Sequence, residues 1–369
     1  MLFKEYNNFN FSFPSPQYLG AKHTHLPWIK QFIPKDIKSA LDGFAGSQSV
    51  AFLFKQIGIK TITNDFLNFN HQIGLALIQN NCEKLTPSDV EVLMQPSSEK
   101  HNFNLMEDVF ANIFFEVNEA RFLDNFRANI QLLKSKNKQA LAFTIMNRSM
   151  TRKVTMGHFG HTQALKYASD PERVKRNRSL IRPLEDIFKE LVTEYNAAIF
   201  DNDKSNTSYN ENILDLLPRL ENIDLAYFDP PYCDSHADYQ GFYHLLETFT
   251  EYWGDKKFIN GIRRYEPQRF SGFDKKREIV SSFEKLFDNA QEIPNWLISY
   301  NDRSYPSVSE LSTLISRHRD VTVEVKPYQN GRGGKGSVAG SHEVLFICKP
   351  RKRHILNKQT IELDLNERL

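Results

Sequence analysis

The chain has 369 residues, of which 40% are hydrophobic and 25% are charged, and its formal net charge is +2. This composition is typical of a folded soluble protein and excludes a disordered chain, while the length allows one large domain or a domain with an insertion. Uncharged apolar runs stay well short of the ~20 residues that a membrane span needs, and no secretory signal pattern precedes them. We therefore expect a cytoplasmic protein with no membrane partner.

The charge is distributed unevenly along the chain. Between Lys134 and Arg182 there are twelve basic and two acidic residues, a net charge of +10, so the remaining residues carry a net charge of −8. Because clustered lysine and arginine side chains contact phosphates, this basic segment favours a polyanionic partner over a merely solvated helix face. Interleaved Ser, Thr, Asn and Gln residues agree with contacts to nucleic acid.

A β-α-β unit is predicted near the N-terminus. From residue 37 the sequence reads IKSALDGFAGSQSVAFLFKQIGIKTITND. A short apolar run ends at Asp42, a helical pattern follows a turn of small residues, and a second strand ends at Asp65. Parallel strands joined by a helix predict an α/β sheet whose ligands gather at the carboxyl ends of the strands.

Residues 86–185 interrupt this alternation. A long helical pattern followed by the basic segment predicts a mainly helical inserted domain, with a discontinuous α/β domain formed by residues 1–85 and 186–350. Strand candidates then return at LAYFDP, KFINGI, NWLISYN, VTVEVKPY and EVLFICKP, and the last two flank a glycine-rich loop. The prediction is a Rossmann-like doubly wound sheet with a terminal β-hairpin, followed by a peripheral charged tail at residues 351–369.

Cysteine and histidine spacing indicates no metal site. Cys82, Cys233 and Cys348 are odd in number and far apart, so reduced structural thiols are expected. His158 and His161 lie three residues apart, but no nearby cysteine or acid completes a ligand set. We interpret both histidines as polar loop residues and predict no metal.

The first strand-to-helix turn, LDGFAGSQSV, has features of a ligand-binding loop. Small residues let the backbone approach a ligand closely, and helix N-terminal amides favour an anionic group. The dinucleotide pattern G-x-G-x-x-G is missing, so a nicotinamide enzyme loses support. Asp65, after the next strand, suits either two ribose hydroxyls or a helix cap, and these alternatives stay open.

The stretch LAYFDPPYCD ends an apolar strand with an acid and two prolines. Pro230 and Pro231 fix their φ angles and lack N–H groups, so the Asp229 carboxylate and the Pro230 carbonyl become fixed acceptors. Two acceptors suit the exocyclic amine of adenine, because accepting its hydrogens stabilises the positive charge that develops on alkylation. Tyr232 offers a ring face on which a displaced base can stack.

These residues carry a family resemblance. DPPY at 229–232 together with LDGFAG at 41–46 resembles the S-adenosylmethionine-dependent DNA adenine-N6 methyltransferases, and the motif order is similar to their alpha group, the D12 or deoxyadenosine-methylase-like class. QYLGAKHTHLPWI, ISYN and SHEVLFICKP resemble the N-terminal motif, a later strand motif and the terminal hairpin of that class. The likeness spans roughly residues 16 to 350 and is weakest across the insert, which would be the target-recognition domain.

The resemblance implies a site for S-adenosylmethionine. Two positions depart from the family pattern: Asn212 stands where an acid is usual beside the cofactor adenine, and Gln48 replaces the second glycine of the loop. Asp65 would hold the ribose. The implied cofactor-binding set, whose first three members would lie over the methionine end, is Tyr18, Gly20, Lys22, Asp42, Phe44, Ala45, Gly46, Asp65, Phe66, Asn212 and Asp229.

The implied activity is transfer of a methyl group from S-adenosylmethionine to N6 of a flipped adenine in double-stranded DNA, within a restriction-modification system of prokaryotic or phage type. Asp229, Pro230, Pro231 and Tyr232 would be the catalytic residues. A separately encoded restriction endonuclease would be a cognate partner.

Two other kinds of protein stay open at the level of sequence. One is a methyltransferase acting on RNA adenine or on a protein amide, and the other is a catalytically dead DNA-binding module. DNA contacts are predicted where arginine, lysine and glutamine can reach phosphates or base edges. The residues predicted to make them are Arg148, Arg152, Lys153, Gln163, Arg332 and Lys335.

Overall fold

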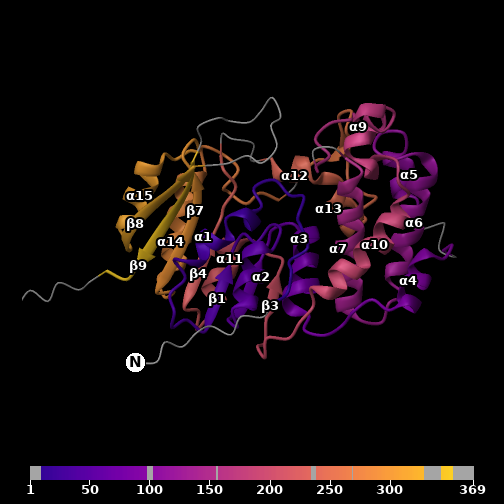
Figure 1. The fold of residues 1–369 in the computed structure, drawn as a ribbon. Coiled ribbons are helices and arrows are strands. Elements are labelled where there is room, and N and C mark those ends of the chain that lie inside the picture. Colours follow the sequence, from indigo (N-terminus) through magenta and orange to yellow (C-terminus); the bar gives the residue numbers. More distant parts are fainter. Residues whose placement is uncertain are drawn as a thin grey trace, which may run out of the picture.

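A seven-stranded sheet forms one side of the molecule and a helical lobe forms the other (Figure 1). This computed structural model describes residues 10–97, 103–154, 157–233, 238–267, 269–327 and 342–351. The strands are, in their order across the sheet, β3 (Thr207–Tyr209), β2 (Lys60–Asn64), β1 (Ser39–Asp42), β4 (Leu225–Phe228), β7 (Asn295–Asn301), β9 (His342–Lys349) and β8 (Asp320–Pro327).

The first five of these strands are parallel, and β9 and β8 are antiparallel to their neighbours. The chain leaves β1 toward β2 on one side and later returns to β4 on the other side, so the order reverses between β1 and β4. Both central strands are buried along their whole length, because helices cover the two faces of a parallel sheet. The predicted doubly wound sheet with a terminal hairpin is confirmed.

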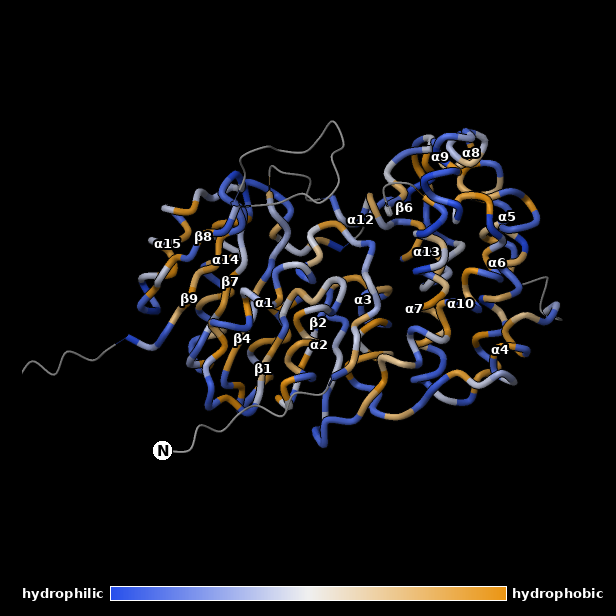
Figure 2. Tube along the Cα trace, viewed as in Figure 1, coloured by the Kyte–Doolittle hydropathy of each residue, from blue (hydrophilic) through white to orange (hydrophobic). Residues whose placement is uncertain are grey.

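Two groups of helices cover the sheet. On one face, α1 (Leu26–Lys30) and α2 (Ser49–Gln56) pack on alternate residues of β1 and β4. On the other face lie α11 (Ile213–Leu216), the 3-10 helix η4 (Leu217–Arg219), α14 (Ile279–Asn289) and α15 (Val308–Ser316). Figure 2 shows many hydrophobic residues, in orange, along the strands and the helices beside them.

The helical lobe contains the predicted insert and shares its core with later elements. One hydrophobic cluster joins helices of the insert to residues of α2, of the segment after β2 and of α13. The lobe consists of α3 (Asn68–Ile73), the π-helix η2 (Gly74–Gln79), α4 (Pro87–Met94), α5 (Leu105–Phe110), α6 (Val117–Ile130), α7 (Lys136–Arg152), α10 (Leu184–Ala197) and α13 (His244–Glu251). The division at residue 86 stays a prediction, since this core continues across it.

Several short elements lie between the longer helices and strands along the chain. They are η1 (Lys22–Thr24), α8 (Ala164–Ala168), α9 (Pro171–Arg176), η3 (Arg178–Leu180) and α12 (Tyr239–Phe242). The strand expected at KFINGI does not join the main sheet: β5 (Phe258–Ile259) pairs only with β6 (Arg264–Tyr265) in a small hairpin. None of the described helices is long and apolar enough to cross a membrane.

Candidate active site

A cleft of about 1020 Å³ opens at the carboxyl ends of β1 and β4, where the strand order reverses. Open α/β sheets bind ligands at this position, because the loops leaving the two strands diverge there. The residues that the family resemblance assigns to the cofactor all line this one cleft: Tyr18, Gly20, Lys22, Asp42, Phe44, Ala45, Gly46, Asp65, Phe66, Asn212 and Asp229. Segments far apart in the sequence therefore meet as predicted.

The loop between β1 and α2 forms part of the cleft wall. Asp42 ends β1, and its Oδ2 accepts a 3.0 Å hydrogen bond from the backbone N–H of Ala51 in the first turn of α2. Gly46 has a φ of +47°, and a Cβ atom there would lie 2.9 Å from the ring of Tyr18. Glycine thus lets the backbone turn tightly beneath Tyr18.

Gln48 occupies the place of the missing second glycine. Its φ is +66°, a left-handed conformation that costs an ordinary residue about 1–2 kcal/mol. The buried side chain makes two hydrogen bonds: Oε1 accepts from the Thr63 hydroxyl at 2.5 Å, and Nε2 donates to the Asn70 carbonyl at 3.1 Å. The loop therefore keeps a left-handed turn without glycine, because these hydrogen bonds offset the strain.

Asp65 joins the loops that follow β1 and β2. Its Oδ2 accepts from Gly46 N at 2.7 Å, and its Oδ1 accepts from Leu67 N at 2.9 Å and Asn70 Nδ2 at 3.1 Å. Burial raises the pKa of Asp65, and these donors oppose that effect. The carboxylate thus shapes the cleft wall, and the remaining lone pair on Oδ2 leaves the predicted ribose contact as a prediction.

Asn212 lies at the start of α11. Its Oδ1 accepts from Leu214 N at 3.0 Å, so the amide oxygen caps the helix while the residue lines the cleft. Glu211, which the sequence analysis did not single out, lines the same cleft and pairs with Arg219. Its carboxylate lies one residue before the position where the family usually has an acid.

Asp229 belongs to a buried group of charges. Lys22 Nζ lies 2.8 Å from Asp229 Oδ2 and 3.2 Å from Glu343 Oε1, and it donates to the Tyr232 hydroxyl at 2.9 Å. The Tyr232 hydroxyl donates in turn to Asp229 Oδ1 at 2.8 Å. Burial works against the charged Lys22 ammonium, but the carboxylates of Asp229 and Glu343 outweigh it and raise the pKa of Lys22.

This arrangement bears on two predictions. The Lys22 ammonium contacts the two carboxylates while Lys22 lines the cleft, and its place over the methionine end of the cofactor stays a prediction. Pro230 and Pro231 line the cleft, whereas Tyr232 does not, and its ring makes an edge contact with Tyr300 at 5.8 Å. Stacking of a base on Tyr232 therefore stays a prediction.

Two residues at this site, Glu343 and Tyr239, were not predicted from the sequence. Glu343 was an acid within the otherwise apolar strand EVLFIC, which marks a buried charge that needs a partner. Tyr239 lies on α12, lines the cleft, and stacks on Tyr18 with ring centroids 5.8 Å apart. A tyrosine in a short polar segment carried no comparable signal.

Comparison with known proteins shows which family has this sequence. The model of the D12 class N6 adenine-specific DNA methyltransferases matches residues 18–313. The chain belongs to this family. It is therefore an N6 adenine-specific DNA methyltransferase that uses S-adenosylmethionine, and RNA or protein amide methylation is not its family activity.

Individual relatives agree with the family match. The Type II methyltransferase M2.HphI of Haemophilus parahaemolyticus is 34% identical over 353 residues, which cover 93% of this chain and 99% of the relative. The modification methylase StsI of Streptococcus sanguinis is 25% identical over 93% of this chain and 53% of that protein. The Type II methyltransferase M.CviAII of Paramecium bursaria Chlorella virus 1 is 22% identical over 89% and 97%, respectively.

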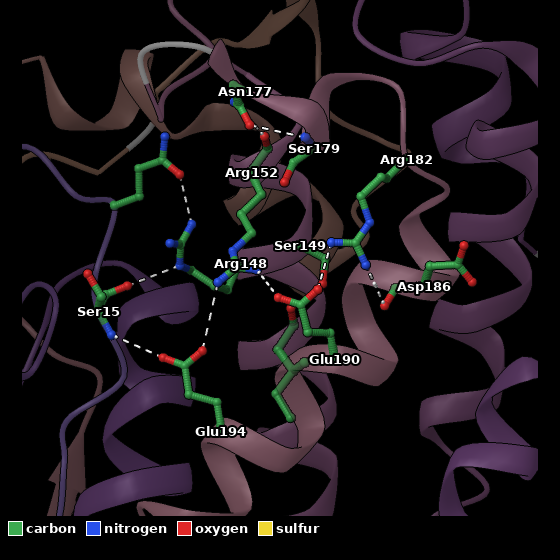
Figure 3. A network of polar contacts seen from close by, with 12 residues as sticks. Ser15, Arg148, Ser149, Arg152, Asn177, Ser179, Arg182, Asp186, Glu190 and Glu194 are labelled. Atoms are coloured by element: carbon green, nitrogen blue, oxygen red, sulfur yellow. Dashed lines mark hydrogen bonds and ion pairs between the residues drawn. The ribbon is translucent and has the colours of Figure 1, made fainter. Parts of the chain in front are cut away.

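The basic residues predicted to contact DNA on α7 have partners inside the methyltransferase. Arg148 donates to the Ser15 carbonyl at 3.2 Å and to Gln17 Oε1 at 2.8 Å. Arg152 pairs with Glu190 Oε1 at 2.8 Å on α10. Figure 3 shows this network joining α7, α10 and the N-terminal segment.

Lys153 is similarly occupied. It is buried, and its Nζ lies 2.6 Å from Glu119 Oε1 and donates to the Arg182 carbonyl at 2.9 Å. Gln163 is exposed and its side chain accepts from the Tyr167 hydroxyl. The structure thus gives Arg148, Arg152 and Lys153 contacts within the protein in place of free charges, because α7 packs against α10 and α6. Arg332 and Lys335 lie outside the described residues.

Other basic residues of the same segment are exposed. Within the part of the chain that the structure describes, no ion pair or side-chain hydrogen bond engages Lys166 on α8, Lys175 and Arg176 at the end of α9, or Arg178 at the start of η3. In Figure 1, α9 lies at the same upper side of the molecule as α12, which contributes residues to the cleft. The positive charge that the sequence indicates is therefore available to solvent above the α7–α10 network.

Proposed function

We propose that this enzyme methylates N6 of an adenine that has swung out of a specific site in duplex DNA. The observation that carries the proposal is the position of the Asp229 carboxylate and both prolines in the wall of the cofactor cleft. A base inside a duplex cannot reach such a recessed turn, so it must leave the stack at a cost of a few kcal/mol.

The residues after β4 account for the chemistry. Asp229 and the Pro230 carbonyl accept the two hydrogens of the adenine amine, which directs the nitrogen lone pair toward the methyl donor. S-adenosylmethionine supplies a methyl group on a positively charged sulfur. One N–C bond forms and one S–C bond breaks, so the positive charge passes to the amine nitrogen. That nitrogen then loses one proton, and we assign the Asp229 carboxylate as the base that accepts it.

The walls of the cleft suit the cofactor in several ways. The Gly46 turn and the N-terminus of α2 bring backbone amides close to the cleft, and Asp65 and Asn212 add polar oxygen atoms. The remaining cofactor contacts are assigned to Tyr18, Gly20, Lys22, Asp42, Phe44, Ala45, Phe66 and Asp229. We assign Lys22 a role through Asp229, since its ammonium lies 2.8 Å from that carboxylate.

The lobe formed largely by residues 86–185 is proposed to hold the DNA. Its exposed cations suit phosphates, and phosphate contacts orient the duplex without reading its sequence. The cations that we assign to this surface are Lys166, Lys175, Arg176 and Arg178. Tyr239 presents a ring in the cleft wall and is a second candidate, beside Tyr232, for stacking on the extruded base.

A restriction endonuclease is the partner that the relatives suggest. Two of the similar proteins are named Type II methyltransferases and a third is named a modification methylase. We propose that this chain likewise protects the sites of a separately encoded nuclease.

Two measurements test the proposed function. Expression in a host that lacks DNA methylation, followed by sequencing that maps N6-methyladenine, should give one short modified motif. Purified protein should transfer tritiated methyl groups to duplexes that contain the motif, and Asp229→Ala should abolish transfer while the protein stays folded. An unmodified genome together with intact cofactor binding would refute the proposed activity, whereas absent S-adenosylmethionine binding would indicate a dead DNA-binding module.

A further inference from the structure

The buried carboxylate of Glu343, on the terminal hairpin, lies next to the DPPY turn. We propose that Glu343 is a positioning residue for methyl transfer: through the shared Lys22 ammonium and the Tyr232 hydroxyl it orients the Asp229 carboxylate, and its negative charge strengthens Asp229 as an acceptor. This inference rests on the role proposed above for Asp229.

The geometry around Lys22 supports this role. The side chains of Lys22 and Glu343 are 5% and 1% exposed, so their charges interact with little screening by water. Asp229 Oδ2 and Glu343 Oε1 lie 2.8 Å and 3.2 Å from the same Lys22 nitrogen. The Tyr232 hydroxyl lies between the two acids, donating to Asp229 Oδ1 at 2.8 Å and lying 3.3 Å from Glu343 Oε1.

The position of Glu343 is set by the sheet. Strand β9 lies between β7 and β8, and Glu343 pairs in register with Asn301 on one side and Lys326 on the other. From β7, the Ser299 hydroxyl lies 3.4 Å from Glu343 Oε1, and it accepts a 2.8 Å hydrogen bond from the Tyr227 hydroxyl on β4. Paired strands of the sheet thus fix the positions of Glu343 on β9 and of its neighbours Ser299 on β7 and Tyr227 on β4.

The charges determine what this arrangement does to Asp229. Glu343, which is buried, and Asp229, whose side chain is 17% exposed, share one ammonium, so the group carries one negative charge in excess when both acids are ionised. Burial raises the pKa of Asp229, Lys22 lowers it, and Glu343 raises it again. Asp229 is therefore held in place by Lys22 without losing its affinity for the proton that the methylated amine must release.

Other titratable groups surround this cluster. From the neighbouring elements these are Asp42 on β1, Tyr227 on β4, Lys326 on β8 and His25, which follows η1. Burial lowers the pKa of His25 to about 4 and raises that of Tyr227 well above its ordinary value. Both side chains are therefore neutral near neutral pH. Burial and the charge of Asp229 raise the pKa of Asp42 well above its ordinary value, so a pH effect is assigned to the acids that share Lys22 only where it changes in Glu343→Gln and Lys22→Met.

The test uses Glu343→Gln, which removes the charge and keeps the size of the side chain. The two acidic oxygens are at most about 6 Å apart, because both lie close to the same Lys22 nitrogen, and removing the negative charge of Glu343 lowers the pKa of Asp229. The acidic limb of the pH profile of kcat, which reports ionisation of Asp229, should therefore move to lower pH. At the optimum, kcat should fall about tenfold, with KM little changed.

Controls separate this effect from a loss of folding. Glu324→Gln makes the same change on β8 of the same hairpin and should leave the profile unchanged. Lys22→Met removes the positive charge and should move the acidic limb in the opposite direction, to higher pH. Melting temperature and calorimetric binding of S-adenosylmethionine report folding and cofactor affinity for each variant. Should Glu343→Gln not fold, the Lys22→Met, Glu343→Gln double variant removes both buried charges together, and its limb should return toward that of the wild type.

The outcomes distinguish the two levels of the proposal. Turnover that survives Asp229→Ala would overturn the proposed function itself. Loss of turnover in Asp229→Ala, combined with an unshifted acidic limb in a folded Glu343→Gln variant, would overturn only the role of Glu343. An equal shift in Glu324→Gln would also reject it, because the effect would then belong to the general charge of the hairpin.

Discussion

Removing the exposed cations of α9 and η3 should weaken the salt dependence of DNA binding. Each phosphate contact adds about 0.9 to the slope of log K against log salt, so the triple change Lys175→Ala, Arg176→Ala and Arg178→Ala should lower the slope by about 2.7. Between about 50 and 200 mM KCl, the affinity of the variant should therefore fall about 40-fold less than that of the wild type. The structure supports this number, because all three side chains are exposed.

Fluorescence anisotropy with a labelled duplex measures this slope. The electrostatic contribution does not depend on sequence, so any duplex longer than the binding site serves. The control variant removes three exposed cations that precede or begin the parallel strands β1, β2 and β3, at the edge of the sheet opposite the cleft: Lys38, Lys60 and Lys204. An unchanged slope for the α9 and η3 variant, or an equal decrease for the control, would refute the assigned surface.

Three further changes probe the cleft and its support. Gly46→Ala should weaken S-adenosylmethionine binding at least about tenfold, as measured by calorimetry. The left-handed backbone costs an alanine about 1–2 kcal/mol, and the added Cβ would lie 2.9 Å from the Tyr18 ring. The control is Gly254→Ala, where an added Cβ meets nothing within 4 Å. Gln48→Ala should lower the free energy of unfolding by about 1–3 kcal/mol in urea titrations, since two buried partners lose their hydrogen bonds; no loss would contradict the strain argument. Burial lowers the pKa of Lys55 from 10.5 to about 7. Above pH 7 the unfolded chain therefore binds more protons than the folded protein, so the free energy of unfolding should rise by about 2.3 kcal/mol from pH 7 to 9. Lys55→Met should remove this rise, and a persisting rise would assign it elsewhere.

The convergence of the acids was predictable from the sequence. Asp42, Asp65 and Asp229 each follow an apolar strand, and the strands of a βαβ unit end at the same edge of the sheet. The pairing of β4 with β1, which brings Asp229 to the same cleft as Asp42, is seen in the structure. The structure adds their hydrogen-bond partners, which come from loops whose path the strand pattern leaves undetermined.

The sign of the charge on the insert was predictable, but the exposed cations were not. The spacing of Arg148, Arg152 and Lys153 leaves open which face of α7 is buried. The acids that pair with Arg152 and Lys153 lie on α10 and α6, at least 34 residues away in the sequence, and the partners of Arg148 lie in the N-terminal segment. Only the packing of these elements brings the partners together. A basic residue therefore indicates a phosphate contact only once the acids around it are known.

The same reasoning explains why the partners of Asp229 were missed. Lys22 belongs to the N-terminal motif and Glu343 to the last strand, so their contact depends on the register of β9 against β7 rather than on any local pattern. A slip of one residue in that register would turn Glu343 to the opposite face of the sheet and leave Lys22 with one acid. The terminal hairpin is thus required for the charge balance at the DPPY turn, and its antiparallel addition to a parallel sheet has a direct consequence for the reacting group.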